Sequence, residues 1–147
     1  AAAQRPVVTH QSGASQIDAL RANYEAAGVQ ADCTPFIEDT ATAFADADII
    51  VCRAGASTVT EIAAVGAAAI FVPFPSAVDD HQTTNAQFLV DAGGGWLVQQ
   101  RDLTPEGLSQ MLLKLERPAL VDIALKAKNM QKINATREVV TACEELA

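Results

Sequence analysis

The clearest sign of the fold lies at residues 48–61 (DIIVCRAGASTVTE), where a short apolar run passes through small residues into a helical pattern. Residues 48–52 are apolar on both faces of an extended chain, which is typical of a buried strand in a parallel sheet. A helix is expected to follow over residues 58–65, and Gly66 ends it. A strand followed at once by a helix is half of a βαβ unit.

The same alternation continues on both sides of this segment. Further strands are expected at residues 7–10, 31–36, 67–72 and 96–98, and further helices at 15–27, 38–47 and 82–92. Beyond these, only helices are expected: one capped by Thr104 with Pro105 in its first turn, and one or two more over residues 119–146. We therefore predict the α/β class, with a Rossmann-like open parallel sheet and helices on both faces.

Composition sets the class of protein. The chain has 147 residues, with 10 Lys and Arg against 18 Asp and Glu, a net charge of −8 and 50% hydrophobic residues. We expect one soluble domain over residues 1–147, in which 104–147 are C-terminal helices. Because no glycine-rich strand-to-helix turn opens the chain, this domain is expected to be incomplete at its N-terminus. The acidic balance argues against a nucleic-acid partner, and no apolar run reaches the roughly 18 residues of a membrane span.

The residues for metal, disulfide or cofactor chemistry are sparse. Cys33, Cys52 and Cys143 include no C-x-x-C pair, which argues against a disulfide framework and a zinc site. His10 and His81 are the only histidines, and their spacing fits no metal motif. The glycine-rich loops of nucleotide hydrolases and dinucleotide enzymes are missing too. We predict no metal and no cofactor.

The turn between residues 52 and 58 is the first candidate site. Ligands of open parallel sheets bind at the carboxyl ends of the strands. Small residues before a helix leave backbone N–H groups open to a phosphate or diphosphate. The alternative is a capping box, in which Thr58 is the N-cap, Glu61 reaches back to it, and Gly55 serves only the turn.

Single residues at two other strand ends have open interpretations. Arg53 comes directly after a buried strand, so its charge is either held for a ligand or paired with Asp79 or Asp80. Phe36 and Ile37 offer an apolar wall to a planar base, or they are ordinary core residues. The residues themselves do not decide between these alternatives.

The third candidate is the loop and helix start at residues 73–86 (PFPSAVDDHQTTNA). Gln82 and Asn85 carry amides of the kind that bind sugar hydroxyls. The alternative for Asp80 is a structural role as the helix N-cap, with Thr83 three residues later.

Several runs together resemble a known family: residues 10–13 (HQSG), 35–39 (PFIED), 47–66 (ADIIVCRAGASTVTEIAAVG), 71–75 (FVPFP) and 80–86 (DHQTTNA). They are similar to the MurG family, the bacterial UDP-N-acetylglucosamine:undecaprenyl-diphospho-muramoyl-pentapeptide N-acetylglucosaminyltransferases. The resemblance implies a GT-B glycosyltransferase, of which this chain is the C-terminal, donor-binding half. It further implies transfer of N-acetylglucosamine from UDP-N-acetylglucosamine to lipid I to give lipid II. The full enzyme would act peripherally at the cytoplasmic face of the inner membrane.

The resemblance assigns the nucleoside first. Ile37 would meet the uracil through its backbone, with Phe36 beside it. Glu61 would hold the ribose hydroxyls. A carboxylate that accepts hydrogen bonds from two neighbouring hydroxyls recognises ribose specifically.

The resemblance also assigns the rest of the donor. Ala56, Ser57 and Thr58 would line the diphosphate and sugar, Gln82 would bind the N-acetylglucosamine hydroxyls, and Arg53 would shape the pocket. Amides at a helix start would stabilise the UDP leaving group as it gains charge. The family needs no tightly bound metal for this step.

The family's pattern is not matched everywhere. Residues 67–69 are Ala-Ala-Ala where the family usually has Leu-Pro-Ala. The resemblance places the catalytic base and the acceptor site in the N-terminal domain, so no catalytic residue is expected here and the chain alone should be inactive. From the residues alone, another GT-B UDP-sugar transferase, a UDP-sugar epimerase or a non-catalytic nucleotide-binding module remain alternatives.

Overall fold

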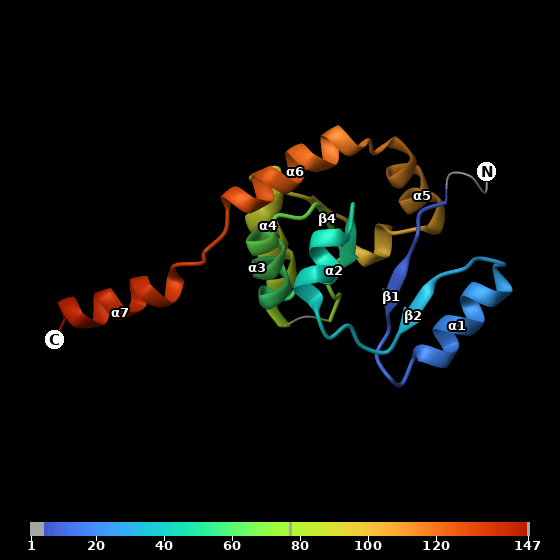
Figure 1. Ribbon diagram of the computed structural model, residues 1–147, viewed down its shortest axis with the longest axis horizontal. Coiled ribbons are helices and arrows are strands. Elements are labelled where there is room, and N and C mark those ends of the chain that lie inside the picture. Colours follow the sequence, from blue (N-terminus) through green and yellow to red (C-terminus); the bar gives the residue numbers. More distant parts are fainter. Residues whose placement is uncertain (1–4, 77, 147) are drawn as a thin grey trace. The chain divides into compact units, whose positions relative to one another are not determined.

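The computed structural model describes residues 5–76 and 78–146 (Figure 1). The chain divides into two compact units, Ala1–Ala43 and Phe44–Ala147, which we call unit 1 and unit 2. Residues 1–4 and 147 of the expected domain, and residue 77 of the expected loop, lie outside the described residues.

Unit 1 is a βαβ unit. Strand β1 (Thr9–Gln11) pairs in parallel with β2 (Asp32–Thr34), and helix α1 (Ile17–Ala26) connects them. Gly28, with a φ of 60°, follows α1 as the sequence predicted. Both strands are shorter than expected, but their order and direction are as predicted.

Unit 2 contains a second parallel sheet, with strand order β3-β4-β5. Its elements are α2 (Thr40–Asp46), which crosses the boundary between the units, β3 (Ile50–Cys52), α3 (Ala56–Val65), β4 (Ala69–Phe71), η2 (Val78–Asp80), α4 (His81–Val90), β5 (Trp96–Leu97), η3 (Gln100–Asp102), α5 (Pro105–Lys114), α6 (Arg117–Asn129) and α7 (Ala135–Glu145). Strands that alternate with helices confirm the predicted α/β class with parallel pairing.

Local sequence signals explain several helix starts. Asp39 Oδ1 accepts a hydrogen bond from the Thr42 N–H (2.9 Å) at the start of α2, and this bond helps to lower the pKa of the Asp39 carboxyl. Thr104 Oγ1 accepts a hydrogen bond from the Gly107 N–H (3.0 Å) at the start of α5, as predicted. Pro118 lies in the first turn of α6, where a missing N–H costs nothing.

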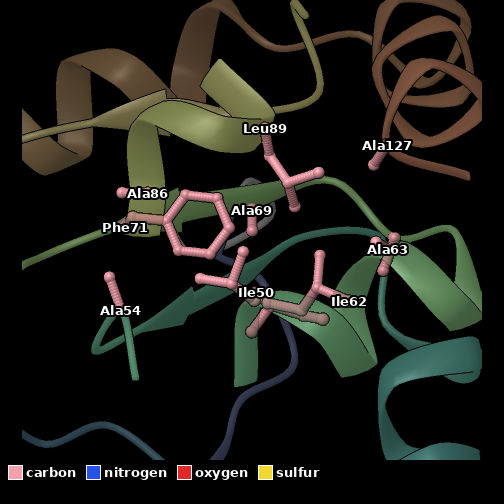
Figure 2. Packing of buried hydrophobic residues seen from close by; sticks show 11 residues of the cluster. Ile50, Ala54, Ile62, Ala63, Ala69, Phe71, Ala86, Leu89 and Ala127 are labelled. Atoms are coloured by element: carbon pink, nitrogen blue, oxygen red, sulfur yellow. The ribbon is translucent and has the colours of Figure 1, made fainter. Parts of the chain in front are cut away.

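The core of unit 2 lies around the central strand β4, all of which is buried. Figure 2 shows Phe71 of β4 and Leu89 of α4 together with Ile62 and Ala63 of α3 and Ala127 of α6. The backbone of Gly94 lies so close to α6 that a Cβ there would be 2.9 Å from the Ala127 backbone. Small residues therefore let the helices approach the sheet closely.

One expectation about burial is wrong. Residues 48–52 were predicted to form a strand buried on both faces, but Val51 is 46% exposed. Within the described part of unit 2, β3 is an outer strand of its sheet and pairs with β4, so its other edge has no neighbouring strand of that unit to cover its side chains. Among the described residues, no helix is both long enough and apolar enough to span a membrane.

Candidate functional site

The turn from β3 into α3 leaves its helix start without a side-chain cap. Gly55 is the N-cap, and the first helical hydrogen bond runs from the Val59 N–H to the Gly55 carbonyl (3.0 Å). The N–H groups of Ala56, Ser57 and Thr58 come before that bond, and no side chain among the described residues caps them. The positive end of the helix dipole is therefore open to an anion.

The capping-box interpretation of this segment is wrong. It required Thr58 as the N-cap, but α3 begins two residues earlier than predicted, so Thr58 lies inside the first turn. Gly55 is not required by the turn either, because its φ of −63° and ψ of 148° suit any residue. A Cβ on Gly55 would meet only Thr58 Oγ1, at 3.8 Å. Glycine here keeps the space before the amides open.

Side chains from α4 hold the peptide groups of Ala54, whose side chain is fully buried. The Ala54 N–H donates to Gln82 Oε1 (3.3 Å), and the Ala54 carbonyl accepts from Asn85 Nδ2 (3.1 Å). Gln82 Oε1 also accepts from the Phe74 N–H (2.9 Å). Because both partners are donors, this atom must be the amide oxygen, and Nε2 is left as a donor for other groups.

Arg53 is held by the end of β4. Its Nη1 donates to the carbonyls of Val72 and Pro73, both at 3.2 Å, and its guanidinium lies over the Phe74 ring. These contacts join the segments that follow β3 and β4. That Arg53 shapes a ligand pocket stays a prediction.

The alternative interpretation of Arg53, pairing with an aspartate, is wrong. Within the described part of the chain, neither Asp79 nor Asp80 forms an ion pair with it, and its Nη1 donates to two carbonyl groups instead. Asp80 is the N-cap of α4, as predicted, but its carboxylate caps no backbone N–H. It accepts a hydrogen bond from the Thr83 hydroxyl instead (2.6 Å).

Glu61 is exposed on α3, one helical turn after Ser57. Residues four apart share a face of a helix, and helical side chains lean toward the N-terminus. The Glu61 carboxylate makes no hydrogen bond or ion pair with any residue that the structure describes. It is therefore available to a ligand next to the α3 amides.

Unit 1 holds the residues expected to meet a base. Phe36 is 66% exposed, so its interpretation as a core residue is wrong. The Ile37 N–H donates to Gln11 Oε1 (2.8 Å), and the Phe36 carbonyl accepts from the Thr34 hydroxyl (2.9 Å). Sequence reasoning missed the role of Gln11, although it stands in the run HQSG that entered the family resemblance.

The remaining predicted site residues, from Arg53 to Gln82, all lie in unit 2. The structure gathers them where β3 and β4 end. Helices α3 and α4 lie side by side (Figure 1), and a hollow of about 260 Å³ between them is lined by Ala56, Val59, Thr60, Thr84, Asn85 and Phe88. Within residues 5–76 and 78–146, no group of three His, Cys, Asp or Glu side chains could hold a metal ion.

Comparison with known proteins identifies the family. The profile of the glycosyltransferase family 28 C-terminal domain matches residues 2–143. The chain belongs to this family. Within family 28, it is 78% identical over 145 residues to the UDP-N-acetylglucosamine–N-acetylmuramyl-(pentapeptide) pyrophosphoryl-undecaprenol N-acetylglucosamine transferase of Paracidovorax citrulli. It is 77% identical over 145 residues to the protein of that name from Polaromonas sp. strain JS666.

A solved structure agrees with this family 28 assignment. The crystal structure of MurG from Acinetobacter baumannii superposes with a TM-score of 0.87 at 46% identity, over 93% of this chain and 42% of that one. This confirms the resemblance to MurG and the predicted half of a GT-B fold. The match covers 99% of this chain but 41% of the Paracidovorax protein and 38% of the Polaromonas protein, so the chain spans about two fifths of its relatives' length.

Proposed function

We propose that this family 28 domain supplies the donor site of an N-acetylglucosaminyltransferase. The enzyme moves N-acetylglucosamine from UDP-N-acetylglucosamine to a lipid-linked muramoyl-pentapeptide, lipid I, and makes lipid II for peptidoglycan. Relatives 77–78% identical carry that activity in their names. In this proposal residues 1–147 act as one UDP-sugar-binding domain, and residues 104–147 are its C-terminal helices.

The observation that carries the proposal is the uncapped start of α3. Three consecutive amides, those of Ala56, Ser57 and Thr58, precede the first helical hydrogen bond, and no side chain within residues 5–76 and 78–146 accepts from them. A diphosphate needs such donors, and the helix dipole adds favourable charge. As the bond to the sugar breaks, the same amides stabilise the negative charge that UDP gains.

Three residues are proposed to contact the nucleoside. Glu61 accepts hydrogen bonds from the two ribose hydroxyls, which its exposed and unpartnered carboxylate allows. Phe36 and Ile37 are the residues proposed for the uracil. Since Gln11 occupies the Ile37 N–H, a uracil bond at that amide requires the Gln11 side chain to turn away, whereas the Ile37 carbonyl accepts no hydrogen bond among the described residues.

The sugar is proposed to meet Gln82. Its Oε1 is committed to the Ala54 and Phe74 amides, so the side chain can only donate, through Nε2, to a sugar oxygen. Arg53 keeps the segments after β3 and β4 in place, as its carbonyl and ring contacts support.

The acceptor, the catalytic base and the membrane belong to the proposed whole enzyme. We place the base and the lipid-linked acceptor site in the part of the relatives that this chain does not span, so the chain alone is inactive. The full enzyme works peripherally at the cytoplasmic face of the bacterial inner membrane. Its donor chemistry uses no metal cofactor, and a net charge of −8 argues against a nucleic-acid partner.

A chimaeric enzyme tests the proposal. This chain replaces the matching segment of the Paracidovorax citrulli transferase, and transfer from radiolabelled UDP-N-acetylglucosamine to lipid I is measured. We expect a kcat/KM within about tenfold of the parent enzyme, which corresponds to about 1.4 kcal/mol. The isolated chain, assayed alone, should be inactive. A folded chimaera that prefers UDP-glucose, or that binds no UDP, would contradict the proposal.

A further inference from the structure

Ala54 joins the end of β3 to the start of α3, and α4 holds it from both sides. Gln82 Oε1 accepts from its N–H and Asn85 Nδ2 donates to its carbonyl, at 3.3 and 3.1 Å. The Ala54 side chain is fully buried and belongs to the same core as Ala86 of α4 (Figure 2). The residue therefore has little freedom to move relative to α4.

The direction of the α3 amides depends on this residue. Only Gly55 separates Ala54 from Ala56, the first residue of the helix. If the peptide groups of Ala54 rotated, Gly55 and the first turn of α3 would rotate with them. The N–H groups of that turn would then no longer point toward one anion. Donors that are fixed before the ligand arrives bind it without the cost of ordering them.

We propose that Asn85 is a positioning residue for the donor diphosphate. The side-chain oxygen of Gln82, Oε1, has the same role, in addition to the proposed contact of Nε2 with the N-acetylglucosamine. The two side chains hold Ala54, and Ala54 holds the amides that bind the phosphates. This inference rests on the proposed function, because it needs a diphosphate at the start of α3. Asn85 thereby raises the affinity for the diphosphate through Ala54, without contacting the diphosphate itself.

The test separates the diphosphate from the nucleoside. UDP and uridine share the base and the ribose, but uridine has no phosphates, and neither ligand carries the N-acetylglucosamine that Gln82 Nε2 is proposed to bind. The chimaeric enzyme described above is titrated with each ligand by calorimetry, as wild type, Asn85→Ala and Gln82→Met. Gln87→Ala is the matched control, because Gln87 is an exposed amide of the same helix.

We expect Asn85→Ala and Gln82→Met each to weaken UDP binding by about tenfold, or 1.4 kcal/mol, and to leave the affinity for uridine unchanged. The control should match the wild type for both ligands. If Asn85→Ala does not fold, Gln82→Met gives the same comparison, since methionine fills similar space without an acceptor. Equal weakening of UDP and uridine, or unchanged UDP binding, would overturn the positioning role. A wild-type chimaera that binds UDP no more tightly than uridine would instead overturn the proposed function.

Discussion

The guanidinium carbon of Arg53 lies 5.4 Å from the centre of the Phe74 ring. With its hydrogen bonds to the carbonyls of Val72 and Pro73, this contact ties the end of β3 to the segment after β4. Phe74 is bonded in turn to Gln82 through its N–H. The positive charge of Arg53 thus lies against carbonyl groups and an aromatic face, and no acidic residue in the described part of the chain pairs with it.

Arg53→Lys should weaken UDP binding although the charge is kept. Lysine has no planar fork of donors for two carbonyls and is held less firmly over a ring. We expect about a fivefold loss of UDP affinity in the chimaeric enzyme, a change of about 1 kcal/mol, measured by calorimetry. Arg137→Lys in the exposed helix α7 is the control and should have no effect. Wild-type affinity in Arg53→Lys would remove the role assigned to these contacts.

Glu61→Ala should abolish the preference for ribose. The wild-type chimaera is expected to bind UDP about tenfold to a hundredfold more tightly than 2′-deoxy-UDP, because a hydrogen bond to a charged group contributes about 1.5–3 kcal/mol. In the variant the two ligands should bind alike. Glu144→Ala in α7 serves as control. A variant that still discriminates would show that another residue reads the ribose.

Gly55→Ala should lower UDP affinity with little net change in stability. Its backbone conformation suits alanine, and the new Cβ makes only an ordinary contact with Thr58. Replacing glycine at such a site reduces the entropy of the unfolded chain, which is worth about 0.4–1 kcal/mol, but alanine is a poorer helix N-cap than glycine by a similar amount. The methyl group would, however, stand before the α3 amides, so UDP affinity should fall. Thermal unfolding and UDP titration of one sample measure both, and unchanged UDP binding would argue against a phosphate at this place.

Cys52 should be far less reactive than Cys143. Burial raises the pKa of the Cys52 thiol from 9.0 to about 12, whereas Cys143 is exposed on α7. At neutral pH an alkylating reagent should modify Cys143 first and Cys52 only on unfolding, as mass spectrometry of the peptides would show. Because the folded state prefers the neutral thiol, its stabilising contribution is present below about pH 9 and is lost as the pH rises toward 12. Equal alkylation rates would contradict this.

The sequence predicted those features that depend on neighbouring residues. Thr104 with Pro105 marked the start of α5, and the alternation of strands and helices gave the class of fold. The capping box failed because Thr58 and Glu61 have the same spacing inside a helix as at its start.

Contacts between distant residues could not be read from the sequence. Gln11 and Ile37 are 26 residues apart, and Asn85 is 31 residues from Ala54. Their hydrogen bonds exist because the fold brings strand ends and helix starts together. The role of Arg53 was open for the same reason, since its carbonyl partners follow β4.

Amide hydrogen exchange in the chimaeric enzyme tests the central claim most directly, namely that the start of α3 binds a diphosphate. We expect UDP to slow the exchange of the Ala56, Ser57 and Thr58 amides strongly, and uridine at equal saturation to leave them unchanged. Protection by UDP at other amides, with these three exchanging as in the free enzyme, would contradict the account.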